Sequence, residues 1–157
     1  MTPHELMTRK LKAAIEAAGA SVPVFSLLLS ALEGEKQQTP SSGIAVRVHA
    51  TGQPHEPQPI YTFAISVTLA ISVDDDKGGD LFKTNHDAIW AAFDYLARGD
   101  NCARLGDEGD DLPEGTAHVF AVDGFQIGEG DDPDYTEDDN GGAWTITFSA
   151  TVTGRAT

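Results

Sequence analysis

Residues 60–73 read IYTFAISVTLAISV, and their side chains divide into two classes that alternate along the chain. Large apolar residues occupy the odd-numbered positions, and small or hydroxyl-bearing residues occupy the even-numbered positions between them. Because successive side chains of a β-strand point to opposite faces, this pattern predicts a long strand with one strongly apolar face and one small, partly polar face. Another part of the chain must cover the apolar face.

A second segment near the C-terminus has the same alternation. Residues 144–153 read WTITFSATVT, with apolar side chains at even positions and threonine or serine at odd positions. Residues 43–50 (GIAVRVHA) and 118–127 (HVFAVDGFQI) are typical of two further strands, the latter bent at Gly124. A proline-rich connection, residues 51–59, joins the strand predicted at 43–50 to the long strand at 60–73. These two strands are therefore expected to be neighbours in an antiparallel sheet.

Two other segments have the apolar spacing of amphipathic helices. One helix is predicted over residues 3–18, where Thr2 can cap it and Glu5 stands where a capping box needs its acid. The other is predicted over residues 80–98, with Asp80 as its cap. Each helix presents an apolar stripe that can lie on the sheet.

The apolar segment 22–32 (VPVFSLLLSAL) has no decisive period, and a short strand followed by a helical turn is one interpretation of it. Taken together, the segments predict a single α+β domain over residues 1–157. Its antiparallel or mixed sheet is expected to have about four or five strands and to be covered on one face by two amphipathic helices.

The chain is strongly acidic, with 25 Asp and Glu against 10 Lys and Arg and a formal net charge of −15. No Lys or Arg occurs between Arg104 and Arg155. A field of this sign repels phosphate groups, so sequence-specific nucleic-acid binding and attachment to anionic membranes are both disfavoured. Solubility alone and a functional acidic surface are both adequate explanations of the charge.

No apolar run approaches the roughly 20 residues that span a bilayer, and no signal peptide is recognisable, so a protein made in the cytosol is expected. The chain has a single cysteine, Cys102, which cannot form an intramolecular disulfide. No catalytic motif surrounds it, and its position just after a helix favours a small buried residue over a reactive thiol.

Residues 128–142 (GEGDDPDYTEDDNGG) predict a long acidic hairpin connection with the composition of a mobile loop. Carboxylates are the ligands that calcium prefers, but their spacing here does not fit the twelve-residue calcium loop. A solvated loop is therefore favoured over a calcium site. The three acids of residues 74–76 are interpreted as charge at the end of a strand.

Motifs for catalysis or cofactor binding are missing from the sequence. The five histidines are scattered, without a His-Glu-x-x-His or Cys-x-x-Cys pattern. No serine stands in a Gly-x-Ser-x-Gly elbow, and no glycine-rich phosphate loop precedes a helix. The sequence thus predicts a protein that is not an enzyme, with no catalytic residues, no cofactor and no metal ligands.

The order of the predicted elements carries a resemblance. A capped helix, a short apolar connector, a strand, a long strand, an amphipathic helix and two final strands with a variable loop follow one another along nearly the whole chain. With its closing pattern from Trp144 to Val152, this order resembles the small tail terminator, or tail completion, proteins of long-tailed double-stranded DNA bacteriophages.

The resemblance implies a structural virion protein in the neck region of the phage tail, made in the host cytoplasm. It would form a ring, expected to contain six subunits, at the head-proximal end of the tail tube. The ring would end tube polymerisation and join the tail to the head. Its partners would be copies of itself in heterologous contact, the tail tube protein and a head-completion or neck protein, while DNA passes the lumen without sequence-specific binding.

In that setting the acidic loop is expected to reach a neighbouring subunit or to line the channel, where carboxylates would repel passing DNA. The candidate contact residues are Asp131, Asp132, Asp134, Tyr135, Glu137, Asp138 and Asp139. Two alternatives stay open: another neck or head-tail connector protein of the same fold, and a small acidic module that binds calcium or another ligand.

Overall fold

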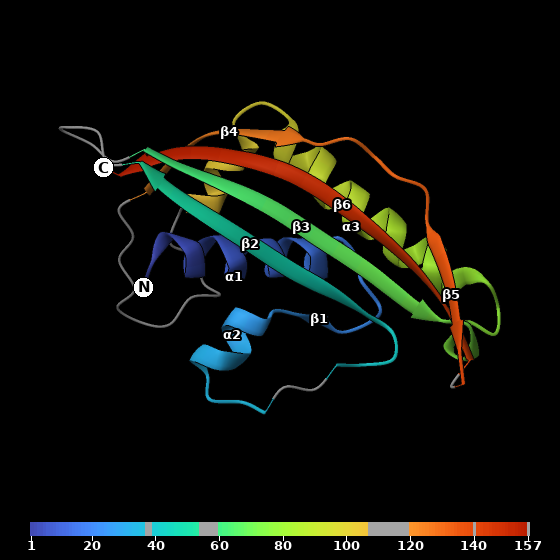
Figure 1. Cartoon of the computed structure of the whole chain (residues 1–157). Coiled ribbons are helices and arrows are strands. Elements are labelled where there is room, and N and C mark those ends of the chain that lie inside the picture. The colour runs from blue at the N-terminus through green and yellow to red at the C-terminus, as the bar shows by residue number, and fades with distance from the viewer. Residues whose placement is uncertain (37–38, 54–59, 107–119, 140, 157) are drawn as a thin grey trace.

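A computed structural model describes residues 1–36, 39–53, 60–106, 120–139 and 141–156, without the side chains of 50–53 and 156. It has two layers, a curved sheet and the helices α1 (Pro3–Ala17) and α3 (Asp80–Ala97) behind it (Figure 1). The predicted α+β class and the covering of one sheet face by two helices are confirmed. The sheet is mixed and has six strands, because two short strands add to the four that the sequence pattern predicts.

The long central strand is β3 (Ile60–Ser72), which pairs antiparallel with β2 (Gly43–Gln53) and with β6 (Gly141–Ala156). The predicted neighbourhood of the two strands joined by residues 51–59 is therefore confirmed. The strand order is β1-β2-β3-β6-β4, and β5 pairs with β6 beyond this path.

Short strands complete both sides of this three-stranded centre. On one side, β1 (Val24–Phe25) pairs in parallel with the start of β2. On the other, β4 (Phe120–Ile127) and β5 (Asp134–Asp138) share the outer edge of β6, one after the other along its length. The ambiguous segment 22–32 thus forms β1 and then a short helix, α2 (Leu27–Leu32).

The core follows the predicted alternation of the long strand. Its apolar residues from Phe63 to Ile71 are at most 1% exposed and lie beneath the two helices. Val73 departs from the pattern, since it is 43% exposed and begins a 3-10 helix, η1 (Val73–Asp75). The strand ends there because its partner β6 pairs only as far as Ser72.

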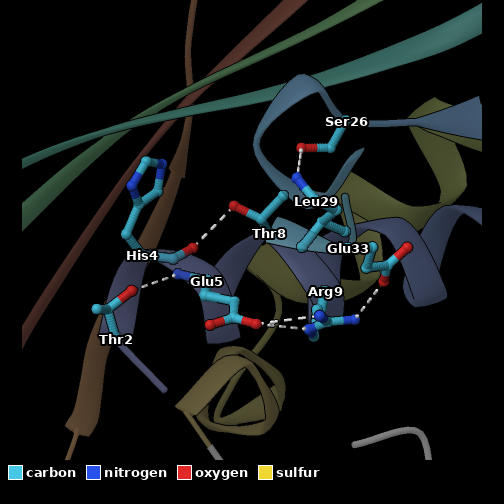
Figure 2. A network of polar contacts seen from close by, with 8 residues as sticks. All are labelled: Thr2, His4, Glu5, Thr8, Arg9, Ser26, Leu29 and Glu33. Atoms are coloured by element: carbon cyan, nitrogen blue, oxygen red, sulfur yellow. Dashed lines mark hydrogen bonds and ion pairs between the residues drawn. The ribbon is translucent and has the colours of Figure 1, made fainter. Parts of the chain in front are cut away.

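Helix α1 begins as predicted, with the Thr2 hydroxyl accepting a hydrogen bond from the Glu5 N–H at 3.1 Å. The Glu5 side chain does not complete a capping box; its carboxylate accepts instead from the Arg9 guanidinium at 3.0 Å. Arg9 also reaches Glu33 at 3.2 Å, which ties α1 to the end of α2 (Figure 2). The Ser26 hydroxyl caps α2 by accepting from the Leu29 N–H at 3.4 Å.

The predicted capping of α3 by Asp80 is wrong. The cap position is Gly79, and Asp80 is the first helical residue. The Asp76 carboxylate performs the capping instead, accepting from the N–H groups of Leu81 at 2.9 Å and Phe82 at 3.3 Å. The loop can turn back over the helix in this way because Gly79 has a φ of 77°, a left-handed conformation that glycine adopts without strain.

Replacing Asp76 with alanine is therefore expected to lower the free energy of unfolding by about 0.5–2 kcal/mol, the usual cost of losing a helix cap. Asp80→Ala is the matched control, because Asp80 accepts no hydrogen bond from the first N–H groups of α3 in the described chain. Urea denaturation of both variants measures the difference. Equal losses, or a larger loss for the Asp80 variant, would contradict the assignment of the cap.

Strand β4 contains the predicted irregularity. Val122 pairs with Gly154 and Gly124 with Thr153, so Asp123 is an extra residue in a β-bulge. The start predicted for this strand, at His118, lies outside the described residues. So do His55, most of the proline-rich connection and residues 107–115 of the polar stretch before the strand.

Candidate functional site

The face of the sheet opposite α1 and α3 carries small and hydroxyl-bearing side chains. Thr68 and Thr147 meet across β3 and β6, with their hydroxyl oxygens 3.0 Å apart. The pairing register also places two large apolar residues at the margins of that face, Phe25 and Ile60. The residues between them are small, polar or hydroxyl-bearing: Ala45, Arg47, His49, Thr62, Ala64, Ser66, Thr68, Ala70, Thr145, Thr147, Ser149, Thr151 and Thr153. We call this surface the open face; in the described part of the chain no helix covers it.

One side of the open face ends at an unpaired strand edge. The Ile44 N–H donates to the Pro23 carbonyl at 2.8 Å, on the β1 side of β2. Since backbone groups alternate in direction along a strand, those of Val46 and Val48 point to the same side. However, β1 ends at the pair Phe25 and Ala45. In a parallel pair of this kind the Phe25 carbonyl accepts from the Val46 N–H, so the unpaired backbone groups of this edge begin at Val48 among the described residues.

A groove of about 710 Å³ runs along this edge and onto the open face. Its cationic or titratable side chains are His4, Arg47 and His49, and its described lining has no Asp or Glu. Three apolar residues, Phe25, Leu27 and Leu28, stand at its wall, with Leu27 57% exposed. The edge of β2 thus combines unpaired backbone groups, apolar surface and positive charge.

The opposite side of the sheet ends in the acidic hairpin. Residues 134–138 form β5, all exposed, so the expectation of a loop without regular structure is wrong for this part of 128–142. Tyr135 packs against Trp144 across the hairpin, with ring centroids 4.9 Å apart and the ring planes tilted by 50°, and the Tyr135 ring lies directly over Gly142. A pair of aromatic rings supplies the apolar contact that the acidic residues lack.

All seven candidate contact residues are exposed and lie together on this one hairpin at the end of the sheet (Figure 1). Asp134 and Asp138 pair with Thr145 and Gly141, which places them on the open face. Tyr135 and Glu137 lie on the other face of the strand by the same register. The remaining three residues flank the strand: Asp131, Asp132 and Asp139.

The carboxylates of this hairpin do not converge on a point. Among the described residues, no group of three or more His, Cys, Asp or Glu side chains is placed to hold a metal ion. A strand holds neighbouring carboxylates on alternate faces, whereas a calcium site needs several oxygens around one centre.

Two of the three acids of residues 74–76, Asp75 and Asp76, accept hydrogen bonds from local partners. Asp75 accepts hydrogen bonds from the hydroxyls of Ser42 at 2.6 Å and Ser41 at 2.8 Å, and these bonds lower the pKa of Asp75. The Ser42 hydroxyl in turn accepts from the Ser72 N–H at 2.9 Å. The cluster joins the start of β2 to the end of β3, and Asp76 caps α3 as described above.

Cys102 is 6% exposed and packs into the core, as predicted. Burial raises the pKa of its thiol, which keeps the thiolate, the reactive form, scarce at neutral pH.

The sequence pattern did not predict a site at the edge of β2. Arg47 and His49 were recognisable as residues on a wet strand face, and the exposed Leu27 lay in a segment whose structure was ambiguous. Their convergence with His4, which lies at the start of α1, depends on the tertiary structure.

No protein-family model matches the chain, and no curated protein is significantly similar to it. No helix in the described ranges is long and apolar enough to cross a membrane.

Proposed function

We propose that this chain is a structural protein that assembles into a closed ring, and that its ring ends the tail tube of a long-tailed bacteriophage and joins it to the head. The observation that carries the proposal is the sheet with one open face and two unlike free edges. One edge is acidic, and the other carries arginine, histidine and leucine. The order of helices and strands also agrees with the resemblance to tail terminator proteins.

Unlike edges favour a ring over a symmetric dimer. Exposed strand edges tend to pair with other strands, and a protein controls this tendency with charge. Two acidic β5 edges repel one another, so the favourable contact joins different surfaces on successive copies. Such heterologous contacts generate a closed ring when the rotation between copies closes.

The acidic charge has a physical role in this setting. A channel lined by carboxylates repels the phosphate groups of DNA, which lets DNA pass without binding. The hairpin residues 131–139 are the most concentrated source of such carboxylates in the described chain, and we assign them to the subunit contact or to the channel wall.

The test is the mass of the purified protein by light scattering after size exclusion, at low and moderate salt, followed by negative-stain images. Closed rings of about six copies are expected. A monomer at every salt and protein concentration would contradict the proposal. Rings that bind the end of purified tail tubes and halt their growth would separate a terminator from another connector of the neck.

The calcium-binding alternative predicts a different result in the same preparation. A ligand that binds only the folded state raises the melting temperature, and the rise continues with the logarithm of the ligand concentration above Kd. Under the ring proposal, millimolar calcium leaves the melting temperature of the monomer unchanged beyond what magnesium does. A rise specific to calcium would favour the binding module.

A further inference from the structure

We infer that the ring contact is a strand pairing: β5 of one copy adds to the free edge of β2 of the next copy. This inference rests on the ring proposed above and names the two surfaces that meet. The occupant of the β2 groove is thus the acidic hairpin of a second copy of the chain.

Strand direction permits this pairing. β2 is antiparallel to β3, β3 to β6, and β6 to β5, so β5 runs opposite to β2. When two copies stand side by side with their open faces on the same side, β5 of one copy therefore meets β2 of the next in antiparallel orientation. The resulting sheet is continuous across the subunit boundary, and its hydrogen bonds satisfy the backbone groups of Val48 and Ala50.

Strand length agrees as well. β5 has five residues, while the part of β2 beyond β1 extends from Val46 to Gln53. Within one copy β5 lies level with the start of β2, since Asp134 pairs with Thr145, Thr145 with Ala70, and Ala70 with Gly43.

For β5 to clear β1, Asp134 must move from the level of Gly43 to that of Thr51. This places Asp138 opposite Arg47. The next copy must therefore be displaced along the strands by roughly 26 Å at about 3.3 Å per residue. A closed sheet accommodates such a stagger by inclining its strands to the ring axis.

Charge supports this choice of occupant. The first 50 residues carry five Lys or Arg and four Asp or Glu, whereas the rest of the chain carries five and 21. Residues 128–139 contain seven acids and no base. The pairing would place Asp134 and Asp138 on the same face as Arg47 and His49, because the register puts all four on the open face.

The apolar part of the groove is compatible with the same contact. Leu27 stands exposed at its wall, and Tyr135 on β5 is 46% exposed in the single copy. Subunit contact would remove apolar surface of both edges from water, which favours association in addition to charge.

A charge exchange tests the contact. Arg47→Glu and Asp138→Arg are each expected to raise the dissociation constant of the ring at least about tenfold, because each places like charges opposite one another at the pair of Arg47 and Asp138. The combination of both substitutions is expected to restore assembly. Arg98→Glu is the matched control: it makes the same change of net charge as Arg47→Glu at the exposed end of α3, where the Arg98 guanidinium pairs with Asp94.

Melting temperatures of all four variants show whether each copy still folds, and ring mass is compared only among variants that do. The Arg47 side chain is exposed and makes no hydrogen bond or ion pair in the described chain, so its replacement is expected to leave the fold intact.

Cysteine cross-linking provides a second readout. In a Cys102→Ala background, the pair His49→Cys and Thr136→Cys, which stand opposite one another in this register, is expected to give a ladder of covalent oligomers on oxidation. The control pair His49→Cys and Thr151→Cys places its second thiol in the middle of the sheet and is expected to give none.

Two contrary results are distinguishable. Rings that form normally in both charge variants and give no ladder would overturn the strand pairing and leave the proposed ring standing. A wild-type chain that is monomeric under every condition would overturn both.

Discussion

Phe63→Ala is expected to lower the free energy of unfolding by about 3–5 kcal/mol, the range for removing a large aromatic side chain from a packed core. Phe63 is fully buried on the apolar face of β3, near the beginning of the strand. Its ring meets that of Phe120 edge to face at 5.2 Å and stacks beside Tyr61 at 6.3 Å. These contacts join β3 to β4 through the core, so the cavity left by alanine is bounded by rigid strands that cannot close it.

Urea denaturation measures this loss, with Thr62→Ala as the control on the same strand. Thr62 is exposed on the open face, and a surface substitution there is expected to change stability by less than about 0.5 kcal/mol. Because the free energy of unfolding of native domains is only about 5–15 kcal/mol, the loss expected for Phe63→Ala is a large fraction of the total stability of the protein. A loss under about 1.5 kcal/mol would show that the core relaxes around the cavity.

Asn85→Ala is expected to cost about 2–4 kcal/mol, since it leaves buried partners without hydrogen bonds. Asn85 is fully buried on α3. Its amide oxygen accepts from the N–H groups of Ser21 at 2.8 Å and Val22 at 3.3 Å. Its amide nitrogen donates to the Ser21 hydroxyl at 3.0 Å and to the Leu81 carbonyl at 2.8 Å.

The Asn85 side chain therefore holds the connection between α1 and β1 against α3, and we call this set of hydrogen bonds the Asn85 clamp. The neighbouring Thr84→Ala is the control, because Thr84 is exposed on the same helix. The comparison is made by thermal and urea denaturation. Hydrogen exchange of the Val22 amide would add a local measurement, with faster exchange expected in the Asn85 variant. Equal stability of the two variants would contradict the role of the clamp.

Asn85 also illustrates where sequence reasoning stops. A polar residue within an amphipathic helix is unremarkable by its spacing, and two of the three partners of Asn85, Ser21 and Val22, lie more than 60 positions earlier in the chain. The prediction of the α3 cap was wrong because it depends on the path of the preceding loop. Asp76 and Asp80 are both acids near the helix start, and the turn at Gly79 decides which one reaches the N–H groups.

The candidate site divides in the same way. The acidic residues of 131–139 were recognisable from composition, but their strand was not, because DYTED has no apolar alternation. The segment pairs with β6, which is itself held in place by β3, and Tyr135 packs against Trp144 on β6. No local sequence pattern predicts the free edge of β2. Whether a strand lies at the edge of a sheet depends on which other strands pair with it.

What the sequence by itself determined is the set of faces: which side chains of β3 and β6 enter the core, which form the open face, and which helices can cover the core. Side-chain direction has a period of two in a strand and 3.6 in a helix, so a few adjacent residues suffice to establish it. Only the tertiary structure decided the strand order, the two unlike edges, the Asn85 clamp and the hairpin strand. Each of these depends on contacts between distant segments, whose free energy is gained only after the core has brought those segments together.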